Sequence, residues 1–85
     1  MNKEYLTVGG RRIVLNTDNK VLSIFKDRNG HPLSHGAKFV EVVYGLKIKG
    51  VVAGSSEGKL YATFNNNQGV SFWKSFKTEN VILLD

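Results

Sequence analysis

The 85-residue chain contains no cysteine and only one proline. Without cysteine it cannot form a disulfide-stabilised scaffold or a zinc site built on thiolates. No apolar run approaches the roughly 20 residues that a membrane-spanning helix needs, and the opening MNKEYLTVGG lacks the pattern of a secretory signal. We therefore expect one soluble, cytoplasmic domain with no membrane partner, whose 41% hydrophobic and 22% charged residues are typical of a globular protein.

The sequence also lacks a sustained 3.6-residue period, so no long helix is expected. Short runs rich in Val, Ile, Phe and Tyr instead alternate with clusters of Gly, Asn, Asp and Ser, which is typical of strands and turns. The predicted strands are Tyr5–Val8, Arg12–Leu15, Val21–Phe25, Lys38–Tyr44, Lys47–Val52, Lys59–Phe64, Val70–Trp73 and Val81–Leu84. One helical turn is expected at 78–80, with Thr78 as its cap. This pattern predicts an all-β fold that closes into a small barrel.

Alternation along the predicted strands assigns side chains to the two faces of the sheet. The turn-rich segment Gly54–Gly58 predicts that the strands on either side of it pair antiparallel. The side chains expected to point inward are Ile48, Val52, Leu60, Ala62, Phe64, Val70 and Phe72. Those expected to point outward are Lys47, Lys49, Lys59, Tyr61 and Trp73. The strand Lys38–Tyr44 has apolar residues on both faces, so we expect it to be central or covered on both sides.

The segment KDRNGHPLSHGAKFVEVVYGLKIKGVVAG, residues 26–54, carries a series of turn and strand motifs. They are Asp27, Gly30, Pro32-Leu33, Gly36, Phe39–Tyr44 and Gly50-Val51-Val52. The chain ends with Phe72-Trp73, a short turn and Val81–Leu84. In these motifs residues 26–85 resemble SH3-like barrels of the KOW or Tudor type, although Ala37 stands where an acidic residue is common. The resemblance implies an SH3-like small barrel with a 3₁₀ turn before the last strand, and a function in binding nucleic acid or peptides.

Residues 1–25 precede that resemblance and are expected to form an N-terminal β-hairpin that extends or caps the barrel. The hairpin turn falls at Gly9-Gly10, followed by Arg11-Arg12. This Gly-Gly-Arg-Arg run lacks the spacing of a phosphate-binding loop, so it is interpreted as a turn with basic flanks. The domain organisation is therefore a single domain, with residues 1–25 as the hairpin extension and 26–85 as the barrel.

Residues capable of catalysis are few and scattered. His31 and His35 share a loop whose nearest carboxylate is Asp27, so they are expected to be solvated side chains and not metal ligands. The acidic residues form no close pair, and no serine has a base in sequence reach. Glu41 lies mid-strand among apolar neighbours and is expected at an edge or rim, paired with a lysine. We predict no catalytic residue, no metal and no cofactor, and expect that the protein is not an enzyme.

Positive charge is the strongest functional signal in the sequence. Twelve Lys and Arg against seven Asp and Glu give a net charge of +5, which favours an anionic partner. Nucleic-acid binding uses cations for the phosphates and flat side chains for the bases. The predicted nucleic-acid-binding residues are Lys47, Lys49, Lys59, Tyr61, Trp73, Lys74, Lys77, Arg11 and Arg12. RNA is favoured over duplex DNA, because no helix is available to enter a major groove.

A protein-binding module is the alternative prediction, with Tyr44, Trp73 and Phe76 as exposed aromatic anchors and an acidic partner or an enzyme as the target. The small size, the absence of cysteine and the basic character also resemble those of small phage accessory proteins. Among these, the chain is similar to the phage inhibitors of ToxN-type ribonuclease toxins, which act together with RNA. That resemblance implies RNA and a host toxin as joint partners.

Overall fold

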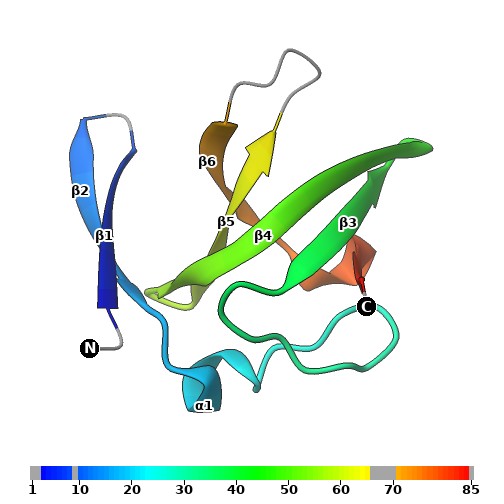
Figure 1. The fold of residues 1–85 in the computed structure, drawn as a ribbon, viewed down its shortest axis with the longest axis horizontal. Coiled ribbons are helices and arrows are strands. Elements are labelled where there is room, and N and C mark those ends of the chain that lie inside the picture. Colours follow the sequence, from blue (N-terminus) through cyan, green and yellow to red (C-terminus); the bar gives the residue numbers. More distant parts are fainter. Residues whose placement is uncertain (1–2, 9, 66–70, 85) are drawn as a thin grey trace.

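The computed structural model describes residues 3–8, 10–65 and 71–84. Antiparallel strands dominate this part of the chain, and the helical elements are one short α-helix and one 3₁₀ turn. The elements are β1 (Lys3–Val8), β2 (Arg11–Asn16), α1 (Asn19–Leu22), β3 (Lys38–Val43), β4 (Leu46–Ser56), β5 (Lys59–Asn65), β6 (Ser71–Phe76), η1 (Thr78–Asn80) and β7 (Val81–Leu83) (Figure 1). The predicted all-β class is correct. The described part of the chain has no helix that could cross a membrane.

Strands β3 to β7 form the barrel. Strand β3 pairs antiparallel with β4, β4 with β5 and β5 with β6, and β7 returns to pair with β3, so the order across the sheet is β7-β3-β4-β5-β6. The η1 turn connects β6 to β7. Its N-cap is Lys77, with no side-chain capping hydrogen bond, so the predicted cap at Thr78 is wrong. This is the predicted small all-β barrel with a 3₁₀ turn before its last strand. It is partly open, because no pairing joins β6 to β7 among the described strands.

The long strand β4 carries the bend that curls the sheet. Its first half pairs with β3 as far as Val51, and its second half pairs with β5 from Gly50 onward. A Cβ atom added at Gly50 would lie 2.7 Å from Cζ of Phe39 and 2.9 Å from Cε1 of Phe64. Glycine is therefore required here, because it leaves room for both rings at the bend.

The main core fills the inside of the barrel. Its buried members are Leu22, Leu33, Phe39, Val52, Leu60, Ala62, Phe64, Phe76 and Val81. Phe39 stacks on Phe76 with ring centroids 4.9 Å apart, and it meets Phe64 edge-on at 5.7 Å. Burial of each such side chain contributes on the order of 1.5–3 kcal/mol, and favourable ring geometry adds to that. The inward positions predicted for β4 and β5 are correct.

The β1–β2 hairpin stands to one side of the barrel (Figure 1). Leu15 packs with Ala53 in a second, smaller cluster, and Ile13 and Tyr61 lie against it. The hairpin joins the barrel sheet where Asn16 of β2 pairs with β4 at Ser55. The predicted N-terminal hairpin extension is therefore present, and it covers the outer side of the sheet where β4 meets β5.

The predicted strand Val21–Phe25 is wrong, because the chain forms helix α1 there. Asp18 caps the helix, and its side chain accepts a hydrogen bond of 2.9 Å from the backbone N–H of Lys20. The helix turns the chain under the barrel and buries Leu22 completely in the main core. A local cap and one buried leucine outweigh the strand preference of Val21 and Ile24. Strands β4 and β6 also run further than predicted, and Val70 lies outside the described residues.

Asp27 fastens the loop before β3 to the last strand. Its Oδ1 accepts hydrogen bonds from the backbone N–H groups of Asn29 (2.9 Å) and His31 (2.8 Å). Its Oδ2 accepts one from the N–H of Leu83 (2.9 Å). Burial by itself would raise the pKa of the Asp27 carboxyl, but these three donors, with the nearby His31 ring, hold that pKa below its ordinary value. The sequence indicated only a turn at Asp27, and its long-range partner was missed.

Candidate nucleic-acid interface and adjoining groove

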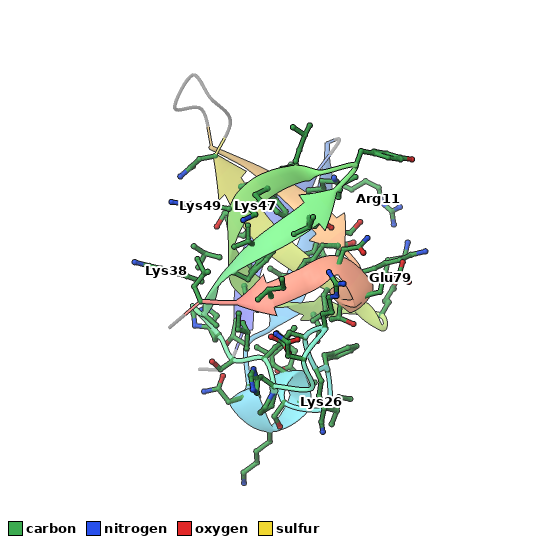
Figure 2. All side chains as sticks on the ribbon, turned by 90° about the vertical axis from the view of Figure 1, so that its right-hand side faces the viewer. Arg11, Lys26, Lys38, Lys47, Lys49 and Glu79 are labelled. Atoms are coloured by element: carbon green, nitrogen blue, oxygen red, sulfur yellow. The ribbon has the colours of Figure 1, made fainter. Side chains whose placement is uncertain are left out.

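Three lysines share the outer face of β3 and β4. In the antiparallel ladder Lys47 lies opposite Val42, Lys49 opposite Val40, and Lys38 opposite Val51. Directly opposed residues point to the same side of a sheet, so all three lysines project from one surface. Their side chains are exposed, and Figure 2 shows Lys38 and Lys49 projecting to the same side of the molecule. Lys47 and Lys49 were predicted to share this face, whereas Lys38 was missed.

Trp73 extends the same surface across the sheet. The register aligns Lys38, Val51, Thr63 and Trp73 in one row over β3, β4, β5 and β6. Neighbouring strands lie about 4.8 Å apart, so Trp73 is three strand spacings, roughly 14 Å along the curved sheet, from Lys38. Trp73 is 39% exposed, which agrees with its predicted outward direction. We define the lysine face as Lys38, Lys47, Lys49 and Trp73.

Two predicted members of this surface lie elsewhere. Tyr61 points outward as predicted, but it is half-buried against the cluster formed by Leu15 and Ala53, so the docked hairpin leaves less of it available to a ligand. Lys74 pairs with Ala62, whose side chain lies inside the barrel, and therefore projects from the opposite side of β6 to Trp73. Its Nζ atom is 5.9 Å from the ring centroid of Phe64, in reach of a cation–π contact at the barrel mouth.

The remaining basic residues of the prediction are not brought together with the lysine face. Lys59 begins β5, and Lys77 precedes η1; both line a groove described below. Arg11 and Arg12 lie on β2, and Figure 2 shows Arg11 on the opposite side of the molecule from Lys38 and Lys49. The sequence could place these residues on strands, but it could not place the hairpin relative to the barrel.

The aromatic anchors of the alternative prediction differ in exposure. Tyr44 is fully exposed at the tip of the β3–β4 hairpin. Its φ of 51° is followed by a φ of 79° at Gly45, a type of turn that usually holds Asn or Gly at both positions. Phe76 is only 7% exposed and stacks on Phe39, so its predicted role as a surface anchor is wrong. The predicted strand ended at Trp73, whereas β6 continues to Phe76, and alternation over the longer strand places Phe76 inward.

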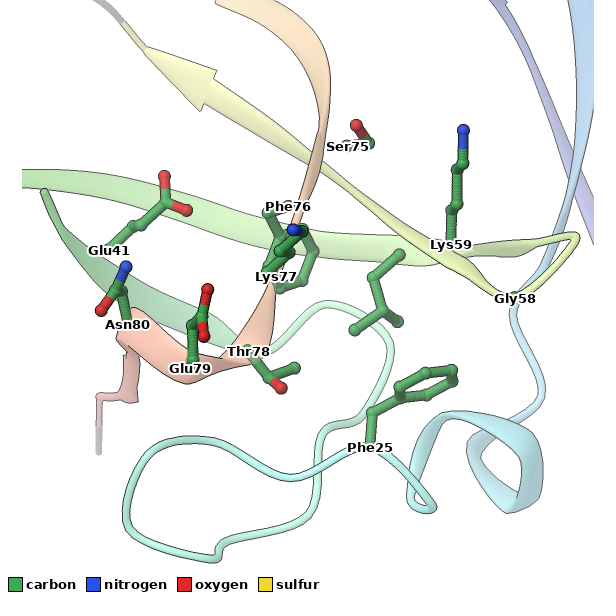
Figure 3. Close-up of a pocket in the computed structure, with 11 residues that line it drawn as sticks. Phe25, Glu41, Gly58, Lys59, Ser75, Phe76, Lys77, Thr78, Glu79 and Asn80 are labelled. Atoms are coloured by element: carbon green, nitrogen blue, oxygen red, sulfur yellow. The ribbon is translucent and has the colours of Figure 1, made fainter.

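An open groove of about 640 Å³ runs between β3, the start of β5 and η1. Figure 3 shows Glu41, Glu79 and Asn80 at one end and Lys59 with Gly58 at the other. Phe25, Leu60 and Phe76 provide apolar surface along the groove. Glu79 lies on the opposite side of the molecule from Lys38 and Lys49 (Figure 2), so the groove and the lysine face are separate surfaces.

Glu41 is the unusual residue of this groove. Its side chain is 7% exposed, and its Oε1 atom has no hydrogen-bond partner. β3 lies between β4 and β7, so the expected edge position of Glu41 is wrong. Among the described residues no lysine forms an ion pair with Glu41, so the expected lysine partner is wrong too. The signal was available: Glu41 shares its inward face with Phe39, two residues before it.

The histidines give no site. His31 is exposed, and its Nδ1 lies 3.7 Å from Oδ2 of Asp27. Within the described ranges, no three His, Asp, Glu or Cys side chains gather in a way that could hold a metal ion. Comparison with family models, with curated proteins and with solved structures returns no match. The function is therefore argued from the geometry of these surfaces.

Proposed function

We propose that this protein is a non-catalytic RNA-binding module and that the lysine face is its RNA-binding surface. One observation carries the proposal. The outward positions of β3 and β4 hold Lys38, Lys47 and Lys49 and no acidic residue, because Glu41 points inward. No acidic side chain on the outer side of these two strands therefore offsets the positive charge of the three lysines, which suits contacts with a phosphate backbone.

Two exposed aromatic side chains lie near these lysines. Trp73 lies on the same face, and Tyr44 lies at the hairpin tip three residues before Lys47. A tyrosine in the left-handed region costs stability relative to Asn or Gly, and here it makes no buried contact that would offset the cost. A fully exposed ring held there is explained by a role in binding, and base stacking on such rings contributes about 1–3 kcal/mol per base.

The test is a titration of the nuclease-treated protein with fluorescently labelled single-stranded RNA, structured RNA and duplex DNA, read by anisotropy. Three phosphate contacts on a single strand predict that affinity falls about twentyfold between 50 and 200 mM salt. Replacing Lys38, Lys47 and Lys49 with Gln is expected to weaken binding at low salt at least tenfold and to flatten the salt dependence. No binding to RNA at low salt would refute the proposal.

A second triple variant provides the matched control. Lys20, Lys26 and Arg28 are exposed, belong to the segment around α1, and remove the same three charges when changed to Gln. If the lysine face is the site, this control keeps at least about half of the affinity. An equal loss in both variants would mean that the RNA follows the net charge of +5 and not this surface.

We extend this proposal to an inhibitor of a ToxN-type ribonuclease toxin that acts with RNA, as a phage accessory protein. The support is the small, basic, cysteine-free chain together with a surface suited to RNA. The test is recovery of the toxin on the tagged protein with and without ribonuclease treatment. Release of the toxin by the nuclease supports joint binding; retention favours a direct protein contact, and no recovery argues against this partner.

A further inference from the structure

We propose that the acidic end of the groove is a binding site for a basic side chain, an arginine or a lysine, presented by a partner protein. This goes beyond RNA binding, because Glu79 of the groove lies on the other side of the molecule from Lys38 and Lys49 (Figure 2). The end of the groove that holds Glu41 and Glu79 also has the opposite charge to the lysine face. The proposal concerns a second class of partner and does not depend on the first.

The central observation is the unsatisfied Oε1 of Glu41. Buried polar atoms in folded proteins nearly always have a hydrogen-bond partner, because an unmade bond leaves the cost of desolvation uncompensated. Glu41 lines the groove and is more than nine-tenths buried. A donor that enters the groove would satisfy this oxygen and remove the cost, so binding there gains free energy that a solvated carboxyl group would not provide.

The surroundings of Glu41 specify the charge of that donor. Glu79 and the Asn80 amide stand at the same end of the groove (Figure 3). Two carboxyl groups and an amide match an ammonium or guanidinium group, which carries several N–H donors and one positive charge. Lys59 and Lys77 line the groove too, yet neither donates a hydrogen bond to Oε1 of Glu41, so this oxygen remains available as an acceptor.

The shape of the groove favours a side chain over a free ion. The half-buried Phe25 lines the groove together with the buried Leu60 and Phe76, and apolar surface such as that of Phe25 packs against the methylene stem of arginine or lysine while the charged end reaches Glu41. A metal ion is not favoured, because the groove supplies only two carboxyl groups and the described residues form no cluster of three ligands.

The experiment uses the unmodified protein with short peptides followed by NMR. Acetyl-Gly-Arg-Gly-amide and its lysine equivalent are the probes, and the citrulline peptide, which keeps the shape but loses the charge, is the matched control. We expect the two cationic peptides to shift the amide signals of the groove residues from Phe76 to Asn80, with dissociation constants of about 1 mM. The citrulline peptide is expected to bind at least about tenfold more weakly.

Variants locate the contact. Glu41→Gln is expected to weaken the arginine peptide about tenfold or more, and Glu79→Gln less, whereas Glu57→Gln, a glutamate outside the groove, leaves binding unchanged. Equal binding of arginine and citrulline peptides, or binding unaffected by Glu41→Gln, would overturn the proposal. So would tighter binding of Mg²⁺ or spermidine at the same signals, because the occupant would then be a free cation. If Glu41→Gln fails to fold, the citrulline comparison on the unmodified protein decides alone.

Discussion

The two sides of strand β3 present opposite situations for a charged group. On the outer side Lys38 is exposed and lies beside the ladder that carries Lys47 and Lys49. On the inner side Glu41 is buried and one of its oxygens has no partner. Two residues three positions apart on one strand thus belong to two different surfaces. Lys38 lies on a solvated basic surface and Glu41 on a desolvated acidic one.

This difference determines what each surface reveals about its ligand. Exposed lysines cost little to maintain, because water solvates them, and their position is informative only through the absence of acids around them. A buried, unsatisfied carboxyl group is costly, so its presence indicates a specific complement. The net charge of +5 agrees with the basic outer surface but gives no indication of the acidic groove.

The largest expected effect concerns Asp27, which links the loop before β3 to the last strand, β7. Asp27→Asn keeps the shape but turns an acceptor of three backbone N–H groups into a weaker one, so we expect a loss of about 2–4 kcal/mol in the free energy of unfolding. Asp18→Asn, which remains a good N-cap, should change stability by less than about 0.5 kcal/mol. Urea titration measures both, and equal effects would contradict the assigned role.

The same variant tests pH dependence. Because the folded-state pKa of Asp27 lies below the ordinary value of 3.8, this carboxylate stabilises the protein fully above that value. The stabilisation is lost as pH falls through the lower, folded-state pKa. Denaturant titrations between about pH 7 and 2.5 should show this part of the decline in the unmodified protein and its absence in Asp27→Asn. An unchanged decline in the variant would assign it to other groups.

The next effect tests the lysine face. Trp73→Ala is expected to weaken RNA binding by about 1–3 kcal/mol, which is about five- to 150-fold in affinity, because a stacking platform is removed. The arginine peptide should bind in the groove as before. Ser75→Ala, an exposed position two residues along β6, is the control and should leave RNA affinity unchanged. Loss of peptide binding in Trp73→Ala would show that the two surfaces are coupled.

A smaller effect with the opposite sign tests the groove. Glu41→Met replaces the unsatisfied carboxyl with an apolar chain of similar length, and we expect unfolding to require about 1–2 kcal/mol more. Arginine-peptide binding should be lost while RNA binding persists. Glu79→Met, at an exposed position, should change stability by less than about 0.5 kcal/mol. A destabilised Glu41→Met protein would mean that Oε1 is satisfied in solution.

The smallest effect concerns the hairpin tip. Tyr44→Asn should stabilise the protein by about 0.5–1 kcal/mol, because Asn tolerates the φ of 51° better and no buried contact is lost. RNA affinity should nevertheless fall, since an exposed ring is removed. Leu46→Gln, also exposed, lacks the positive φ and should not stabilise. Unchanged RNA affinity in Tyr44→Asn would remove this ring from the interface.

Part of the candidate site was predictable from local pattern. Alternation placed Lys47, Lys49 and Trp73 outward, because a strand repeats every two residues wherever it lies in the sheet. The same rule would have placed Phe76 inward if the strand had been predicted to its full length, but the prediction ended it at Trp73. It also puts Lys38 on the outer face, but the apolar residues on both sides of that strand hid the pattern.

Other residues could be located only from contacts between distant segments. Tyr61 points outward, but it packs against the cluster that contains Leu15, a residue 46 positions earlier, because the hairpin docks on the sheet. Helix α1 forms because Asp18 caps it and because the barrel offers a buried place for Leu22. Neither the docking of the hairpin nor that buried place can be derived from a two-residue period.

The sequence by itself determined the all-β class, the hairpins at the glycine-rich turns, the 3₁₀ turn before the last strand and the positive net charge, because these follow from local backbone preference and composition. The tertiary structure alone decided which charges share a surface and which are buried. The pairing of β7 with β3 places Val81 opposite Glu41, and it brings the backbone N–H of Leu83 within hydrogen-bond distance of the Asp27 carboxylate. Desolvation and hydrogen bonding depend on what lies across space, and strand pairing over 40 or more residues sets that arrangement.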